Sequence, residues 1–206
     1  MELQGSLLSW GPEIGVRPWE TIERIELSGG AWVDVQRNWV VGADVLFERL
    51  VEGVAWRAER RAMYDRQVDV PRLLASYDAA DPLPDPALLE VRRALNGRYG
   101  PSVGGPVARV GLCLYRDGRD SVAWHGDTIG RGGTEDVVVA IVSLGWPRRL
   151  HLRPRAGGPG LRFEVGGGDL LVMGGSCQRT WEHAVPKSAR PVGPRISVQF
   201  RPSGVA

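Results

Sequence analysis

The chain of 206 residues contains little cysteine, and it has no long apolar run. Its two cysteines, Cys113 and Cys177, cannot build a disulfide framework, and neither lies in a CxxC motif, which favours a reducing compartment. No apolar run approaches the roughly 18 residues that a membrane span requires. The start of the chain lacks the basic segment and apolar block of a secretory signal. We therefore expect a cytoplasmic protein that does not bind membranes.

Lysine is nearly absent, since Lys187 is the only lysine among 26 basic residues. This bias has two explanations that the sequence leaves open. One is a GC-rich coding sequence, and the other is recognition of phosphates or carboxylates, which suits the planar guanidinium fork. The net charge of +2 excludes a strongly basic protein, so nucleic-acid binding would need a local patch of positive charge.

Helical patterns are few, whereas glycine is abundant. Of 28 glycines, 19 follow residue 100, and they separate about eight short apolar or alternating runs. Such runs without intervening helices predict an antiparallel sandwich or barrel. The predicted strands cover residues 107–115, 121–125, 137–144, 150–153, 161–165, 170–173, 180–185 and 195–200. The fold class is therefore mainly β, with an α+β layer in the first hundred residues, and we expect one domain.

The N-terminal layer contains its own local signals. A small hairpin is predicted at residues 23–27 and 31–35, around a Ser-Gly-Gly turn, and a strand at residues 54–62. Residues 43–52 predict an amphipathic helix. Asp85 followed by Pro86 predicts the start of a second helix that runs to about Asn96, and a glycine- and proline-rich connector follows at residues 97–106.

Histidine is also scarce, with only His125, His151 and His183 in the chain. His125 begins a His-Gly-Asp sequence, and residues i and i+2 of a strand point to the same face, so the imidazole and Asp127 can converge on one metal ion. With His183, 58 residues later, they would form the two-His, one-carboxylate triad of non-haem Fe(II) sites. A His-x-Asp sequence also arises by chance, and an ordinary core or surface histidine is the alternative.

The last predicted strand alternates between polar and apolar residues. Two arginines on one face of a barrel strand are costly unless they meet anions, and a dicarboxylate could satisfy Arg195 bidentately. Two exposed arginines on an edge strand are the alternative. The polar face consists of Arg195, Ser197, Gln199 and Arg201, and the apolar face of Ile196, Val198 and Phe200.

Several blocks in the second half of the chain resemble a known family. The sequence LCLYRDGRDSVAWHGD at residues 112–127 is similar to the signature of AlkB-type dioxygenases. The similarity continues, in the same order, through residues 142–145, 168–175, 181–183 and 194–201, and covers roughly residues 70–202. This resemblance implies a double-stranded β-helix, or jelly-roll, core at about residues 106–201, preceded by an N-terminal extension and substrate lid at about residues 1–105.

The resemblance also implies an enzyme that uses Fe(II), 2-oxoglutarate and O₂. It assigns iron binding to His125, Asp127 and His183, and it makes Arg195 the partner of the distal carboxylate of 2-oxoglutarate. The remaining implied roles are as follows. Tyr115, with Cys113 and Ser197 beside it, would contact the co-substrate. Arg201 would lie near the co-substrate and the substrate entrance. The residues near the substrate would be Arg72, Tyr77, Trp124 and Ile129. Ordinary strand packing is an equal alternative for Trp124.

Two positions depart from the family pattern. Cys113 stands where the family has asparagine, and a thiol replaces an amide donor poorly, which puts one co-substrate hydrogen bond in doubt. Ile129 stands where many members have an acidic residue that contacts the exocyclic amine of the damaged base. The resemblance therefore predicts the reaction type more firmly than the substrate.

The implied function is oxidative dealkylation of N-alkylated bases in DNA or RNA, which is DNA repair chemistry that releases succinate, CO₂ and formaldehyde. A base in a duplex would have to be flipped out to react. Two alternatives stay open: an oxygenase of the same fold acting on a protein or small molecule, which Ile129 favours, and a non-catalytic binding module. We expect a monomer. The arginines that could hold phosphates, or simply form a solvated face, are Arg57, Arg60, Arg61, Arg66, Arg72, Arg148, Arg149, Arg153 and Arg155.

Overall fold

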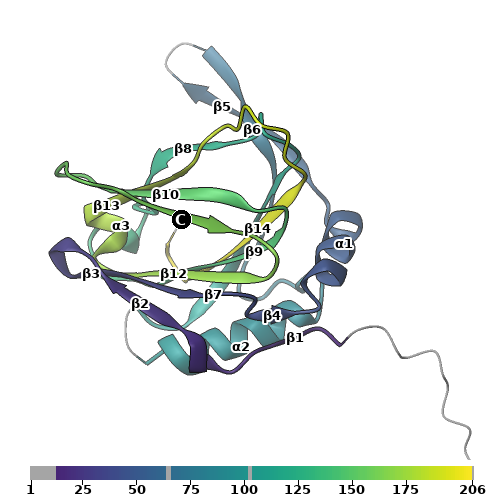
Figure 1. Cartoon of the computed structure of the whole chain (residues 1–206), viewed down its shortest axis with the longest axis horizontal. Coiled ribbons are helices and arrows are strands. Elements are labelled where there is room, and N and C mark those ends of the chain that lie inside the picture. The colour runs from purple at the N-terminus through teal and green to yellow at the C-terminus, as the bar shows by residue number, and fades with distance from the viewer. Residues whose placement is uncertain (1–12, 64–65, 102–103, 206) are drawn as a thin grey trace, which may run out of the picture.

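Two antiparallel sheets form the body of the protein (Figure 1). The computed structural model describes residues 13–63, 66–101 and 104–205. Within these ranges the large sheet has eight strands in the order β2-β3-β12-β9-β14-β7-β6-β5, and the small sheet has four in the order β11-β10-β13-β8. This arrangement confirms the predicted mainly-β class and fits the predicted jelly roll.

The strand bounds are these. The large sheet contains β2 (Glu23–Glu26), β3 (Ala31–Gln36), β5 (Arg57–Met63), β6 (Arg66–Tyr77), β7 (Val107–Tyr115), β9 (Val139–Gly145), β12 (Asp169–Gly175) and β14 (Arg195–Pro202). The small sheet contains β8 (Val122–His125), β10 (Arg148–Pro154), β11 (Leu161–Val165) and β13 (Trp181–Val185). A further short pair joins β1 (Gly15–Val16) to β4 (Val40–Val41). All eight strands predicted after residue 106 are present, with β7 and β11 at the predicted bounds.

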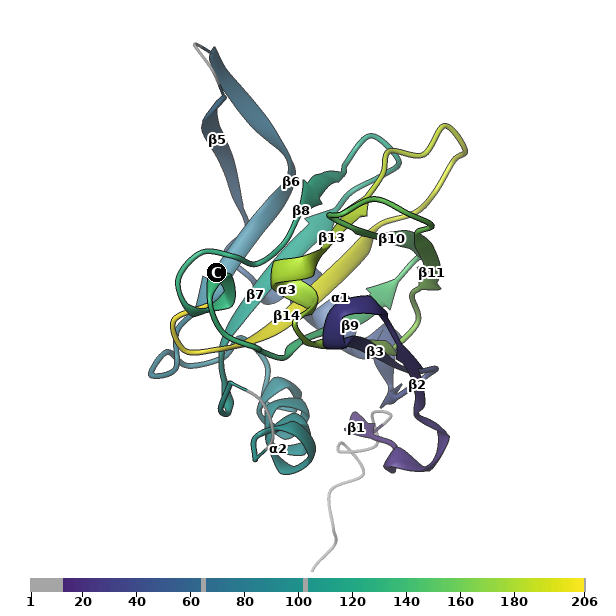
Figure 2. The same ribbon diagram turned by 90° about the vertical axis from the view of Figure 1, so that its left-hand side faces the viewer.

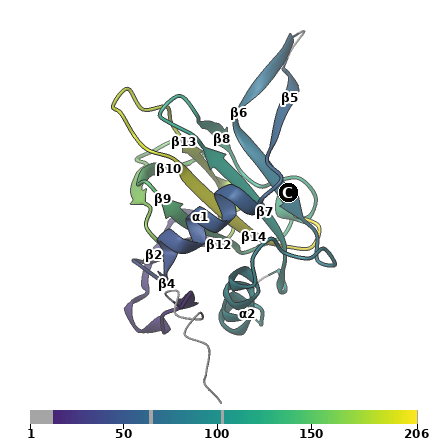
Figure 3. The same ribbon diagram turned by 90° about the vertical axis from the view of Figure 1, so that its right-hand side faces the viewer.

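The helices lie mainly on one side of the large sheet (Figure 3). They are α1 (Ala43–Gly53), α2 (Ala87–Tyr99) and the short α3 (Cys177–Thr180), with single 3-10 turns at Trp19–Thr21, Ser28–Gly30 and Arg131–Gly133. Helix α2 runs past the predicted end at Asn96, because Tyr99 is buried and its hydroxyl donates to Asp34 at 2.8 Å. That contact outweighs the roughly 1 kcal/mol cost of Gly97 inside the helix. Asp85 Oδ1 accepts the Ala87 amide at 2.8 Å, so the predicted helix start is satisfied as expected.

The N-terminal strands differ from the predicted layer. Both helices pack on the core as expected, but β2, β3, β5 and β6 extend the large sheet itself. Strand β6 was not among the predicted strands, and it pairs with β7 through the register Leu73↔Leu114. Strands β5 and β6 form a hairpin that projects beyond the rest of the molecule (Figure 2).

Two apolar cores lie on opposite faces of the large sheet. Leu46 and Leu88 pack with Phe200 between this sheet and the helices, whereas Leu150 and Met173 pack between the two sheets. Strand β14 therefore has no solvent-exposed face, and its neighbours β9 and β7 leave it no free edge. The alternative of an exposed edge strand is excluded. No helix in the described ranges is long and apolar enough to cross a membrane.

Candidate active site

Three potential metal ligands converge between β8 and β13. His125 ends β8, Asp127 follows in the next loop, and His183 lies on β13 directly opposite His125 in the strand pairing. The two imidazole centroids are 4.2 Å apart, and one ligand atom from each of the three residues lies within 4.8 Å of the other two. His151, by contrast, faces away from this cluster. Two imidazoles and one carboxylate form a donor set that suits Fe(II).

Asp127 is buried and held from two sides. Its Oδ2 accepts a hydrogen bond from Arg201 Nε at 2.7 Å, and its backbone amide donates to Gln178 Oε1 at 2.9 Å. Burial alone would raise the pKa of this carboxyl, but the charge and the hydrogen bond of Arg201 lower it to about 2. Asp127 therefore stays ionised, which is the form that binds metal.

The two histidines are held by different features of the site. Burial, reinforced by His125, lowers the pKa of His183 to about 3, although Asp127 opposes the shift. The Nδ1 atom of His125 lies 2.8 Å from the carbonyl oxygen of Ala123. Because a carbonyl only accepts, Nδ1 is the donor in this contact, and Nε2 faces Asp127, whose Oδ1 is 3.9 Å away.

Arg195 lies nearby in the interior with unused donors. Its side chain is 1% exposed, and its Nη2 donates to Ser143 Oγ at 2.7 Å. Within the described residues its Nε and Nη1 have no hydrogen-bond partner. Burial lowers its pKa, while the neighbouring Tyr115, whose ring centroid is 5.2 Å from the guanidinium carbon, opposes that shift. A buried guanidinium with two free donors fits a carboxylate bound in the fork geometry.

The strand pairing places the other predicted co-substrate residues beside Arg195. In the β7–β14 register, Tyr115 is opposite Arg195 and Cys113 is opposite Ser197. Burial raises the pKa of Tyr115 to about 12, so its hydroxyl remains a neutral donor. Ser197 Oγ accepts from Gln199 Nε2 at 2.7 Å, and the Cys113 thiol lies 3.7 Å from Gln199 Oε1.

Comparison with known proteins decides the family. The model of the "2OG-Fe(II) oxygenase superfamily" matches residues 46–201. The chain belongs to this superfamily. The human alpha-ketoglutarate-dependent dioxygenase alkB homolog 3 is 29% identical over 92% of the chain and 69% of that protein. The bovine alkB homolog 3 is 30% identical over the same shares. The DNA oxidative demethylase ALKBH2 of Arabidopsis thaliana is 31% identical over 44% of the chain and 36% of that protein.

Solved structures agree on the fold. OsALKBH1 superposes with a TM-score of 0.53 at 14% identity, covering 87% of this chain and all of that one. An oxidoreductase of the 2OG-Fe(II) oxygenase family from Burkholderia pseudomallei gives 0.53 at 13% identity, covering 84% and 85%. The family model and the alkB homologues make the protein an AlkB-like dioxygenase, an enzyme class that uses Fe(II), 2-oxoglutarate and O₂. The His-Asp-His cluster and the free donors of Arg195 fit the iron and the co-substrate, respectively.

A groove of 410 Å³ lies beside the co-substrate residues of this oxygenase. Two of the predicted substrate residues, Arg72 and Tyr77, line it together with Cys113 and Arg201. Arg72 donates from Nη1 to the Ser121 carbonyl at 3.0 Å, while its buried Nε has no partner among the described residues. Strands β6, β7 and β14 therefore bring the implied substrate and co-substrate residues to one place.

The other two predicted substrate residues lie outside this groove. Trp124 precedes His125 in β8, so its side chain emerges on the opposite face, where the guanidinium carbon of Arg153 is 4.1 Å from its ring. Ile129 is 72% exposed in the loop after Asp127. Of the arginines considered for phosphate contact, Arg148 is buried and donates to backbone carbonyls. The side chains of Arg61 and Arg66 lie outside the part of the chain that the structure describes.

Three polar residues of the site were not predicted. Ser143 holds Arg195, Gln178 holds the Asp127 amide, and Gln199 joins Ser197 to Cys113. Ser143 and Gln199 lie in the blocks that resemble the family, and strand alternation puts Gln199 on the face of Arg195. No local signal marks Gln178, which lies 51 residues from its partner.

Proposed function

We propose that this AlkB-like dioxygenase removes N-alkyl groups from bases in nucleic acid by oxidation. The observation that supports this most directly is the groove beside the co-substrate residues, because an aromatic ring and several arginines line it. Tyr77 offers a flat face for a base. Arg57, which is close enough to oppose the rise that burial causes in the pKa of Tyr77, offers a cation for a phosphate, whereas Arg109 is paired with Asp78 at 2.7 Å. The relatives named alkB homolog 3 and DNA oxidative demethylase support the same substrate class.

The residues divide between holding the reagents and keeping them in the reactive form. His125, Asp127 and His183 would hold the iron, and Arg195 with Tyr115 would hold the carboxylate of 2-oxoglutarate. With Fe(II), 2-oxoglutarate and O₂ bound, the centre supplies hydroxylation of a C–H bond, coupled to conversion of 2-oxoglutarate to succinate and CO₂. An N-methyl group so hydroxylated leaves as formaldehyde and restores the base. Arg201 keeps Asp127 ionised throughout.

Selection of the alkylated base follows from the side chains at the groove. A duplex base cannot reach a buried site, so the base must be unpaired or flipped. Stacking on Tyr77 would contribute roughly 1–3 kcal/mol, and a positively charged alkylated base would gain further from the aromatic face. Ile129, which is apolar and exposed outside the groove, offers no side-chain acceptor to an exocyclic amine. Selectivity would then depend on shape and charge.

The test is succinate release from a panel of methylated oligonucleotides, each paired with its unmethylated counterpart. We expect methylated oligonucleotides to stimulate release and to yield formaldehyde in equal amount. His183→Ala, which removes a metal ligand, should abolish both. If no methylated oligonucleotide binds or stimulates succinate release, the nucleic-acid proposal fails, and an oxygenase of proteins or small molecules takes its place. The monomeric state and the cytoplasmic location stay predictions.

A further inference from the structure

The outer face of the small sheet carries a basic surface that the active site does not use. Alternation along β10 buries Leu150 and Leu152 and turns Arg149 and His151 outward. A groove of 550 Å³ lies on this face, between β10 and the segment at residues 186–192. We name this face, including the groove, the outer basic surface. It comprises Trp124, Trp146, Arg149, His151, Arg162, Lys187 and Arg190.

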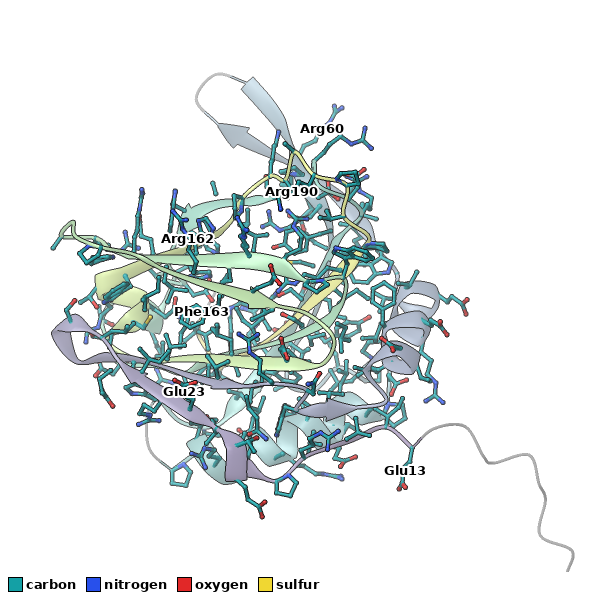
Figure 4. The ribbon with its side chains drawn as sticks, in the orientation of Figure 1. Glu13, Glu23, Arg60, Arg162, Phe163 and Arg190 are labelled. Atoms are coloured by element: carbon teal, nitrogen blue, oxygen red, sulfur yellow. The ribbon has the colours of Figure 1, made fainter. Side chains whose placement is uncertain are left out.

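The charges on the outer basic surface are mostly unpaired. Arg153 and Arg155 both pair with Glu182, at 2.9 and 3.0 Å. Among the described residues, no ion pair involves the four remaining cations, which are Arg149, Arg162, Lys187 and Arg190. Among the described residues that line the groove, Glu164 alone carries a carboxylate. Figure 4 shows Arg162 and Arg190 on one side of the molecule and Glu13 and Glu23 on the other.

Two exposed tryptophans accompany these cations. Trp146 is 53% exposed at the groove, and Trp124 is 37% exposed further along the sheet. His151 connects them, because it lines the groove and its ring centroid lies 6.2 Å from that of Trp124. Strand β13 lies between the strand of His151 and the strand of Trp124. Its residue opposite His151 is Ala184, whose side chain is small. A positively charged groove that carries exposed aromatic rings is an arrangement that binds single-stranded nucleic acid.

The position of this surface relates it to the active site. Trp124 is adjacent in sequence to His125, and Ala184 is adjacent to His183, so the surface lies on the reverse side of the strands that carry the metal ligands. His125 itself is 37% exposed at β8, the edge strand of the small sheet. A ligand strand that runs along the outer face past both tryptophans therefore reaches β8, the edge strand on which His125 of the metal-ligand cluster is partly exposed.

We propose that the outer basic surface binds a single strand of nucleic acid, namely the segment that flanks the base held in the active site. Its phosphates would meet the unpaired cations, and one of its bases would stack on Trp146, the more exposed of the two tryptophans. Trp124 carries the Arg153 guanidinium over its ring and would contact the strand beside it. A duplex hides its base faces, whereas a single strand offers them, and this favours the single strand as the occupant. The inference rests on the proposed function for the identity of the substrate strand.

The experiment measures binding of an unmethylated, fluorescent oligothymidine of about twelve nucleotides at several salt concentrations. We expect Trp146→Ala to weaken affinity about tenfold, because one stacked base is lost. Arg149→Ala combined with Arg190→Ala should weaken affinity and reduce the salt slope by about 1.4, since each phosphate contact on a single strand contributes about 0.7. The matched control is Arg93→Ala, an exposed arginine on α2 at the other end of the molecule, which should change neither quantity.

The outcomes separate this inference from the proposed function. Wild-type affinity and salt slope in both surface variants would overturn the inference, even if methylated oligonucleotides are turned over. Loss of binding in the surface variants alone would support it, even if the wild-type enzyme turns over no methylated base. Polyglutamate that binds with the same dependence on Arg149 and Arg190, and without dependence on Trp146, would assign the surface to an acidic protein and reject the nucleic-acid strand.

Discussion

Replacing Arg195 by methionine should stabilise the protein in the absence of 2-oxoglutarate. The guanidinium is buried, and two of its donors have no partner among the described residues. Replacing a buried charge with an apolar side chain of similar volume raises the free energy of unfolding by about 1–4 kcal/mol. The lost hydrogen bond to Ser143 lowers it by about 1 kcal/mol. A net gain of about 2 kcal/mol raises the melting temperature by roughly 4–8 °C.

The matched control is Arg148→Met. Arg148 is also buried, but its guanidinium donates to the carbonyls of Asp117, Asp120 and Pro186 at 2.8–3.0 Å. Removing it leaves three carbonyl acceptors without their donor, at about 1 kcal/mol each. We therefore expect the melting temperature of Arg148→Met to fall by roughly 6–12 °C, the opposite sign from Arg195→Met.

The same variants test the co-substrate anchor. With Mn(II) under nitrogen, 2-oxoglutarate at a hundred times its dissociation constant should stabilise the wild-type protein by about 2.7 kcal/mol. Arg195→Met should lose this stabilisation, and Arg195→Lys, which keeps a charge but not the fork, should bind 2-oxoglutarate about tenfold more weakly or worse. A destabilised Arg195→Met protein, or undiminished stabilisation by 2-oxoglutarate in either variant, would refute the reasoning.

Three further predictions concern the surroundings of the site. Burial raises the pKa of Tyr115 to about 12 in the folded protein, against about 10 in the unfolded chain. The free energy of unfolding that this shift contributes below pH 10 is therefore lost as the pH rises from 10 to 12. In chemical denaturation over this interval, Tyr115→Phe should lose on the order of 2–3 kcal/mol less unfolding free energy than the wild type. Burial raises the pKa of Cys177 to about 12, whereas Cys113 lines the groove, so a thiol reagent should label one cysteine per chain and none in Cys113→Ser. Gln178→Leu leaves the Asp127 amide without its acceptor, and metal titration should show affinity reduced about 10- to 100-fold.

Local patterns in the sequence predicted the strands that have clear alternation and clear turns at their ends. The bounds of β7 and β11 were predicted correctly for this reason. Strand β6 was missed because Pro71 and mixed polar residues disrupt its pattern, and only pairing with β7 defines it. The end of α2 was also missed, because it depends on Tyr99 reaching Asp34, 65 residues away. Local sequence reasoning cannot supply such distant contacts.

The position of Trp124, unlike that of β6, could be predicted from local alternation. The alternation that predicts convergence of His125 and Asp127 also directs the side chain before His125 to the opposite face. Strand alternation therefore predicts the face on which Trp124 lies. The family resemblance instead predicts a position near the substrate, which the structure does not show. Gln178, in contrast, could be found only from the structure, because α3 and the loop after β8 approach each other only in the folded protein.

The position of each residue in the large sheet explains why the cofactor residues were easier to predict than the substrate residues. Arg195 lies on β14, a central strand that is buried on both faces and paired on both edges, so its surroundings are fixed by the whole core. Tyr77 lies on β6, beside the edge strand β5 and the projecting hairpin. Few core contacts restrict an edge strand, so its sequence can change with the substrate while the fold is retained. In the large sheet, the motif on the central strand β14 therefore identifies the co-substrate, and the residues near the edge of this sheet have to be tested for the substrate.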